Sequence, residues 1–292
     1  MPYEYSYKKA TIDDLPLIAE WIVKISQDPA QHCIHSWAGE SAKEVAEGLI
    51  SYFNDGELLY ILAYHKDKLI GSMGMEFDEE MGAAWLHGPL IDTVHRNACA
   101  NPLYEKTLDE LPAGIKELRA YLNTENEAGK GFYQELGYTN KDHVSYVYQL
   151  PENNRIPLKS DKCISLEKKH EADFLHLYHS LFPDPYYSGE YILEMRGKSH
   201  EVFIVLDDQL FAGFIVICLD ENEIQFLGVE AGQRRKGLGK ALLSCGINYL
   251  FDINKGKCLS LNVSGDLENA QKLYQSVGFS LQFSGMGFTK LL

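Results

Sequence analysis

The chain has 292 residues, of which 45% are hydrophobic and 24% are charged, and its formal net charge is −15. The length predicts two domains with buried cores. The negative charge excludes nucleic acid as an expected partner, because phosphate contacts need clustered lysine and arginine. There is no apolar run long enough to span a membrane and no apolar leader segment, so we expect a cytoplasmic protein that does not bind membranes.

Two segments about 140 residues apart are similar to each other. The first, residues 122–138, reads LNTENEAGKGFYQELGY, and the second, residues 263–279, reads VSGDLENAQKLYQSVGF. A shift of 141 positions places Tyr133 on Tyr274 and Gly137 on Gly278. This period is that of a domain and is too long for a solenoid repeat. The sequence therefore predicts a tandem duplication.

The two halves are separated by residues 151–161, PENNRIPLKSD, a polar segment with two prolines. Such a composition ends one folded unit and spaces it from the next. We therefore predict a first domain over residues 1–150 and a second over residues 162–292.

The second half alternates helix and strand patterns, and the first half gives the same coarse order. Helices are predicted over 172–182, 237–252 and 270–277, and strands over 201–206, 210–219, 224–229, 259–263, 280–283 and 288–291. This order is typical of an α/β (α+β) fold in which helices cover a mixed sheet.

Residues 226–243, FLGVEAGQRRKGLGKALL, run from a predicted strand through a basic loop into a helix. Free N–H groups and the dipole at a helix N-terminus attract anions. Gly237 and Gly239 lack a Cβ and would let the backbone approach a pyrophosphate closely. The positive charge comes from Arg234, Arg235, Lys236 and Lys240. Rossmann and P-loop patterns are both absent; the alternative is a glycine-rich turn with solvated arginines.

At this loop the sequence resembles the GNAT superfamily, whose motif R/Q-x-x-G-x-G/A follows a strand. Arg234, Gly237 and Gly239 match that motif, and residues 270–279, AQKLYQSVGF, match a second family motif, A-x-x-L-Y-x-x-x-G-F. The resemblance covers the whole second half. It implies two tandem acyl-CoA N-acyltransferase folds, each a mixed, mostly antiparallel sheet flanked by helices.

The resemblance implies acetyl-CoA as the co-substrate and no metal. The strand before the loop would contact the pantetheine arm through Leu227, Gly228 and Val229. The phosphates would meet the loop and the helix start, which comprise Arg234, Arg235, Lys236, Gly237, Leu238, Gly239 and Lys240. Two positions depart from the family: Ala231 replaces a common proline, and Leu267 replaces a common asparagine. Asn269 is the substitute polar contact to the cofactor that we expect.

Two side chains stand where the family has catalytic groups. Glu223 occupies the place of a general base that some members use, and Tyr274 that of a tyrosine which protonates the departing thiolate. The alternatives are a solvated carboxylate beside a turn for Glu223 and a core aromatic residue for Tyr274. Residues 182–188, FPDPYYS, are expected either to shape the acceptor site or to form a packed loop.

The first half has no glycine in the equivalent loop, residues 92–100, DTVHRNACA. Each Cβ there would hinder the approach of phosphates. We therefore expect a degenerate GNAT-like domain that keeps Asn126, Tyr133, Gly137 and Tyr138, binds no cofactor, and has a structural or substrate-shaping role rather than a catalytic one.

The expected reaction is transfer of an acetyl group from acetyl-CoA to a primary amine of a small molecule or a protein. The negative charge is compatible with a cationic acceptor. The alternatives are a non-catalytic module that binds or senses acetyl-CoA, and a protein-interaction module. The sequence leaves the oligomeric state open.

Overall fold

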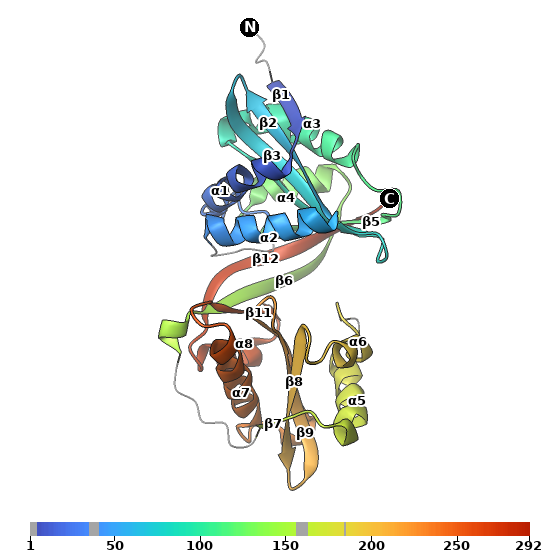
Figure 1. Ribbon diagram of the computed structural model, residues 1–292, viewed down its shortest axis with the longest axis vertical. Helices are drawn as coiled ribbons and strands as arrows, with labels where there is room; N and C mark the ends of the chain where they lie inside the picture. Colours follow the sequence, from blue (N-terminus) through green and yellow to red (C-terminus); the bar gives the residue numbers. More distant parts are fainter. Residues whose placement is uncertain (1–4, 35–40, 156–162, 184) are drawn as a thin grey trace. The chain divides into compact units, whose positions relative to one another are not determined.

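The computed structural model describes residues 5–34, 41–155, 163–183 and 185–292, with two compact units (Figure 1). The first unit comprises Met1–Ser145 with Phe283–Leu292, and the second comprises Tyr146–Gln282. These units differ from the predicted bounds of 1–150 and 162–292. The reason is that β6 (Thr139–Leu150) and β12 (Ser280–Leu291) each begin in one unit and end in the other.

The first unit is a mixed sheet with four longer helices. Its strands are β1 (Tyr5–Lys9), β2 (Leu58–His65), β3 (Lys68–Asp78), β4 (Ala83–Ile91) and β5 (Glu117–Asn123), followed by the end of β12. Its helices are α1 (Leu15–Ser26), α2 (Ala42–Asp55), α3 (Arg96–Leu108) and α4 (Glu127–Glu135). The pairing of β4 with β5 is parallel, and the pairing of β5 with β12 is antiparallel.

The final strand is continuous, although two strands, 280–283 and 288–291, were predicted. Gly285, which falls between the two predicted strands, lies in the middle of β12 opposite Asn123. A Cβ at Gly285 would collide with the ring of Tyr121. The glycine therefore allows a side chain of β5 to cross the strand closely, which is a usual role of glycine inside a sheet.

The second unit repeats this plan. Its strands follow the order β6-β11-β10-β9-β8-β7, and β10 runs parallel to β11 and antiparallel to β9. The strands are β7 (Cys163–Ser165), β8 (His200–Asp207), β9 (Leu210–Cys218), β10 (Glu223–Val229) and β11 (Leu259–Ser264). The helices are α5 (Glu171–Leu181), α6 (Gly189–Glu194), α7 (Leu238–Ile253) and α8 (Glu268–Gln275). The predicted mixed sheet flanked by helices is confirmed.

Alternation along β8 and β9 builds a separate core on each face of this sheet. Val202 and Ile204 pack in a cluster with α5 and α6, whereas Phe203 and Val205 pack in a cluster with α7 and α8. Figure 1 shows these two helix pairs on opposite sides of the strands. Because side chains point alternately to the two faces of a strand, a continuous apolar run serves both cores.

Helix α6 follows directly on the aromatic stretch 182–188 and is an element that the sequence patterns do not predict. The helix begins where the Ser188 side chain accepts a hydrogen bond from the Tyr191 N–H at 3.1 Å, which satisfies one free donor of the first turn. Across the described residues, no helix is both long and apolar enough to cross a bilayer.

Candidate active site

Strand β10 separates from β11 halfway along its length. It pairs with β9 from Glu223 to Val229, whereas its described pairing with β11 covers only Glu223↔Ser260 and Ile224↔Leu261. Residues 226–229 therefore present a strand edge without a ladder partner among the described residues. An extended ligand can bind such an edge through main-chain hydrogen bonds.

The side chains of this edge are partly buried by packing, so its backbone is the main polar feature that it offers to a ligand. Leu227 and Val229 pack against the core beside α7. Gly228 has no room for a side chain, since a Cβ would lie 2.7 Å from Phe214 and 2.8 Å from Leu181. The structure thus places the three predicted pantetheine contacts together on one open edge, and their role in binding stays a prediction.

A β-bulge interrupts β10 at Gln225. Ile224 pairs with Ile217 and Phe226 with Val216, so Gln225 is an extra residue without a partner in this register. The bulge changes the phase of the strand: Ile224 packs on the α7 side, and Phe226 packs on the α5 side against Tyr178 and Phe182. Bulges of this kind redirect side chains and are frequent beside active sites.

Two carboxyl groups lie beside the bulge. Glu223 is partly exposed, yet desolvation raises the pKa of its carboxyl to about 8, and the nearby carboxylate of Glu221 acts in the same direction. A hydrogen bond with the Gln225 amide acts in the opposite direction. Desolvation beside a second carboxylate is one way in which proteins raise the pKa of a carboxyl group, and the role of Glu223 as a base stays a prediction.

His200 joins this group from β8, and sequence reasoning missed both it and Gln225. Cys218 of β9 pairs with His200 on one side and with Glu223 on the other, which brings the three strands into register. The Nε2 atom of His200 lies 3.0 Å from Oε1 of Gln225. No motif marks a lone histidine at the start of a strand, so only the sheet register could have found it.

Helix α7 begins with unsatisfied backbone donors. Gly237 is its N-cap residue in the left-handed region (φ 81°), and it supplies no capping side chain. The first helical hydrogen bond runs from the Ala241 N–H to the Gly237 carbonyl at 3.0 Å. The N–H groups of residues 238–240 therefore lack helical acceptors, as at any helix start. Together with the helix dipole, they form a place suited to an anion.

The connection from β10 to α7 has eight residues, 230–237, and its basic side chains differ in role. Arg234 holds the loop, because its Nε donates to the Val229 carbonyl at 3.2 Å. Lys236 pairs with Asp207 at 2.8 Å, whereas Arg235 and Lys240 are exposed. The charges of Arg235 and Lys240 are therefore directly accessible to phosphates, and Arg234 is exposed as well, whereas Lys236 would first have to leave Asp207.

Gly239 has a packing role that the sequence did not indicate. A Cβ at this position would lie 3.1 Å from Leu273 of α8 and 3.9 Å from Val229. By contrast, a Cβ at Gly237 would meet no atom within 4 Å. Gly237 is thus required by its backbone conformation, and Gly239 by the close approach of α7, α8 and β10.

Tyr274 of α8 lies in the core cluster against which Leu227 and Val229 pack. It is 8% exposed, and desolvation raises the pKa of its phenol to about 12. No hydrogen bond of its hydroxyl is found in the described part of the chain. A neutral phenol without an internal acceptor can act as a proton donor. Leu267 and Asn269, at the start of α8, are both exposed.

Tyr274 and Glu223 come from different sides of the sheet in the second unit. Tyr274 belongs to the α7 side. Glu223 belongs to a network that includes His200, whose ring contacts Tyr187 before α6 and Tyr191 within α6. In the aromatic stretch before α6, Phe182 and Tyr187 are packed; Asp184 lies outside the described residues.

The first unit lacks an open strand edge at the corresponding place. Strands β4 and β5 also separate, since their parallel pairing ends at Leu86↔Ala120. There the Gly88 N–H donates to the Cys33 carbonyl at 3.2 Å, and the Asn123 N–H donates to the His32 carbonyl at 3.0 Å. A segment of the chain itself therefore bridges the gap between β4 and β5.

Two further features of the first unit close this gap. The Tyr133 hydroxyl donates to the Gly88 carbonyl at 2.6 Å. The connection from β4 to α3 has only four residues, 92–95, so the loop that precedes α7 has no counterpart. Sequence reasoning identified the missing glycines but not the shortened loop or the bridging segment.

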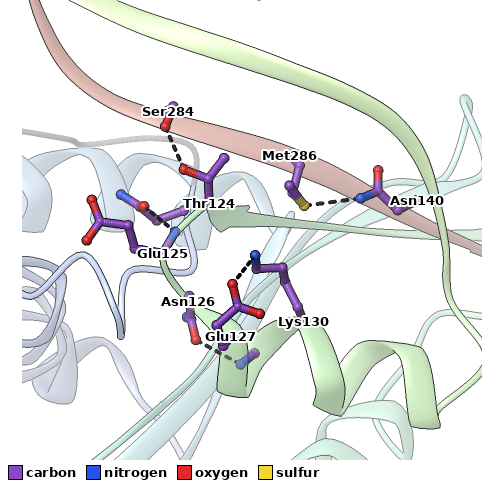
Figure 2. A network of polar contacts seen from close by, with 10 residues as sticks. Thr124, Glu125, Asn126, Glu127, Lys130, Asn140, Ser284 and Met286 are labelled. Carbon is purple, nitrogen blue, oxygen red and sulfur yellow. Dashed lines mark hydrogen bonds and ion pairs between the residues drawn. The ribbon is translucent and has the colours of Figure 1, made fainter.

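Figure 2 shows how the turn between β5 and α4 is held in the first unit. The Asn126 side chain caps α4 by accepting from the Gly129 N–H at 2.8 Å, and its amide donates to the His32 carbonyl at 3.2 Å. The hydroxyl groups of Thr124 and Ser284 are 2.6 Å apart and join this turn to β12. Asn126 thus bonds to the bridging segment, whereas the matching residue of the second unit, Leu267, has no polar side chain.

Comparisons with known proteins agree with this geometry. Residues 170–279 match the sequence model of the acetyltransferase (GNAT) family. A GCN5-related N-acetyltransferase from Sphaerobacter thermophilus has a similar structure, with a TM-score of 0.71 and 14% identity, over 100% of this chain and 96% of that one. A tandem GNAT protein from the clavulanic acid biosynthesis pathway gives a TM-score of 0.63 at 10% identity, over 99% and 98% of the two chains. No curated protein matches the sequence.

The second unit belongs to the GNAT superfamily, and the chain as a whole is a tandem form of the GNAT fold. At these identities the solved structures establish the fold of the chain, and the family match within 170–279 supports acyl transfer by the second unit.

Proposed function

We propose that the second unit transfers an acetyl group from acetyl-CoA to a primary amine. The observation that carries the proposal is the open strand edge of β10, which leads within eight residues to the uncapped N-terminus of α7. An extended arm followed by a pyrophosphate matches these two features in order. When bound, acetyl-CoA would supply the acyl group as an activated thioester.

The chain's own groups would divide the binding work. The free N–H groups at residues 238–240 and the exposed charges of Arg235 and Lys240 would hold the phosphates. The backbone of residues 226–229 would align the arm, and an N–H near Val229 would stabilise negative charge that develops on the thioester oxygen. Arg234 would keep the loop in place through the Val229 carbonyl.

Proton transfers would use the two sides of the sheet. An amine must be neutral to attack, so a base has to remove its proton, and Glu223 with a pKa of about 8 has a suitable proton affinity. Tyr274, neutral because its pKa is about 12, would donate a proton to the departing thiolate from the other side. The carboxyl pair of Glu221 and Glu223 favours an acceptor with positive charge.

The first unit would be structural and would bind no cofactor. Its gap is bridged by His32 and Cys33, and its helix α3 follows β4 without a phosphate loop. One acetyl-CoA per chain is therefore the expected stoichiometry.

The test is release of free thiol from acetyl-CoA in the presence of a panel of primary amines, including diamines, amino sugars, amino acids and lysine peptides. The proposal requires amine-dependent release together with a product heavier by one acetyl group. If acetyl-CoA binds and no amine supports release, the non-catalytic binding module becomes the better account. If acetyl-CoA does not bind, the protein-interaction module does.

A further inference from the structure

We propose that Ser199, His200 and Gln225 form a hydrogen-bonded chain that positions the Gln225 amide against the carboxyl pair of Glu221 and Glu223. In this account His200 is a positioning residue, because it acts on Glu223 only through Gln225. The inference rests on the proposed function in one respect, namely that Glu223 is the general base.

The geometry fixes the direction of each hydrogen bond. The Gln225 oxygen Oε1 can only accept, so the His200 Nε2 atom, 3.0 Å away, must carry the hydrogen. In the neutral ring Nδ1 is then an acceptor, and the Ser199 hydroxyl lies 2.9 Å from it. The pKa of His200 is lowered by desolvation, which favours this neutral form. All donors in the chain therefore point toward Gln225.

With Oε1 held by His200, the amide nitrogen of Gln225 turns toward the carboxyl groups. Its Nε2 lies 3.4 Å from Oε2 of Glu221, the carboxylate that neighbours Glu223, and the Gln225 amide acts to lower the pKa of the Glu223 carboxyl. The His200 contact thus decides that a donor, and not an acceptor, faces the proposed base.

His200 is itself held tightly. It is 2% exposed, and its ring makes edge contacts with Tyr187 at 5.4 Å and Tyr191 at 6.0 Å between ring centroids. The two tyrosines stack on each other at 5.0 Å. A buried histidine fixed by aromatic neighbours can orient a partner side chain more sharply than a solvated one.

The β-bulge explains why a glutamine can reach both partners. Gln225 is the extra residue of β10 at the bulge. Cys218 of β9 pairs with His200 on one side and with Glu223 on the other, so both residues lie close to Gln225. The titratable groups around the network are Glu221 and Asp220 in the turn, Cys218 on β9, His200 on β8, and Tyr187 before α6. Apart from His200 these groups are acids. Glu221 raises the pKa of Glu223, whereas the Gln225 amide, a hydrogen-bond donor, lowers it.

The experiment compares His200→Phe, Gln225→Met and the double variant with the wild type and with His200→Gln, in which an amide nitrogen can replace Nε2. The readout is the pH dependence of kcat/KM for one amine. We expect the midpoint of its rise, near pH 8 in the wild type, to move up by about one pH unit in each single variant. The double variant should show no further shift, and His200→Gln should keep the wild-type midpoint.

A merely structural role for His200 would lower the rate or the stability and leave the midpoint in place. The inference is overturned if His200→Phe and Gln225→Met both keep the wild-type midpoint. If His200→Phe does not fold, Gln225→Met and Ser199→Ala carry the test, because Gln225 and Ser199 are only partly buried.

A second readout separates this inference from the proposed function. In protein labelled with carboxyl-13C glutamate, the Glu223 signal is identified by its loss in Glu223→Gln, and its titration is followed by NMR. The midpoint should shift in the same variants whether or not acetyl transfer occurs. A shifted titration without acetyl transfer would contradict the proposed function and support the network. Acetyl transfer with an unshifted titration would support the proposed function and contradict the network.

Discussion

The hydroxyl of Tyr133 donates a 2.6 Å hydrogen bond to the carbonyl oxygen of Gly88, where β4 separates from β5. The matching tyrosine of the second unit, Tyr274, makes no such bond among the described residues. The same side chain thus helps to close the gap in one unit and is left available in the other. This pair gives a matched test of the catalytic assignment.

We predict different consequences for removing the two hydroxyl groups. Tyr274→Phe should lower kcat by about 100-fold, the lower end of general acid catalysis, because a thiolate is already a good leaving group. The Kd for acetyl-CoA should change little. Tyr133→Phe should leave kcat unchanged and reduce the free energy of unfolding by about 1–3 kcal/mol, since it strands the buried Gly88 carbonyl. Stopped-flow assays and chemical denaturation measure these effects; equal losses of kcat in both variants would contradict the assignment.

Gly237→Glu should abolish acetyl-CoA binding. It places a negative charge at the start of α7, where anion binding is proposed, and also strains a position with φ of 81°. Gly137→Glu is the matched control, because Gly137 has the same φ of 81° and, like Gly237, no atom within 4 Å of an added Cβ. Calorimetry should show wild-type affinity for the control. Similar affinity in both variants would mean that phosphates bind elsewhere.

Glu223 should make stability depend on pH. Its folded pKa of about 8 exceeds the ordinary value of 4.5, so the folded state holds its proton more tightly and loses stability as pH rises between these values. Glu223→Gln removes this dependence. The Tm of the variant minus that of the wild type should therefore grow from pH 5 to pH 8 and then level off. A difference that stays constant over this range would show that the carboxyl titrates normally.

Asn126→Ala should destabilise the first unit by about 1–3 kcal/mol, because it removes the α4 cap and leaves the buried His32 carbonyl with one donor fewer. Asn269→Ala, an exposed change at the start of α8, should alter the free energy of unfolding far less and is the control. Denaturant titrations compare the two. We expect no second acetyl-CoA site in Asn126→Ala, because the shortened connection before α3 is unaffected.

The basic loop before α7 and the place of Tyr274 on α8 could be predicted from the sequence because both carry local sequence patterns. Gly237 needs a positive φ, and a basic loop before a helix carries a local pattern of composition. The network around Glu223 could not be predicted, because His200 and Gln225 meet only through the pairing of three strands and one bulge. Their spacing along the chain carries no signal.

Two features of the first unit could not be predicted from the sequence for a different reason. They are the chain segment that bridges the gap between β4 and β5, and the pairing of the end of β12 with β5. The bridge uses the main-chain carbonyls of His32 and Cys33, which every residue possesses. Strand β12 has an ordinary strand sequence, and nothing in it specifies β5 as the partner of Gly285–Leu291. A sequence pattern can show that a segment forms a strand, but it is less informative about the strand with which that segment pairs.

The measurement that tests the central claim most directly is calorimetric titration of the whole chain with acetyl-CoA, repeated on Gly237→Glu. The account predicts one site per chain in the wild type and none in the variant. Two sites would show that the first unit binds the cofactor despite its bridged gap. Undiminished binding by Gly237→Glu, or no binding by the wild type, would contradict the assignment of the second unit as the acetyl-CoA site.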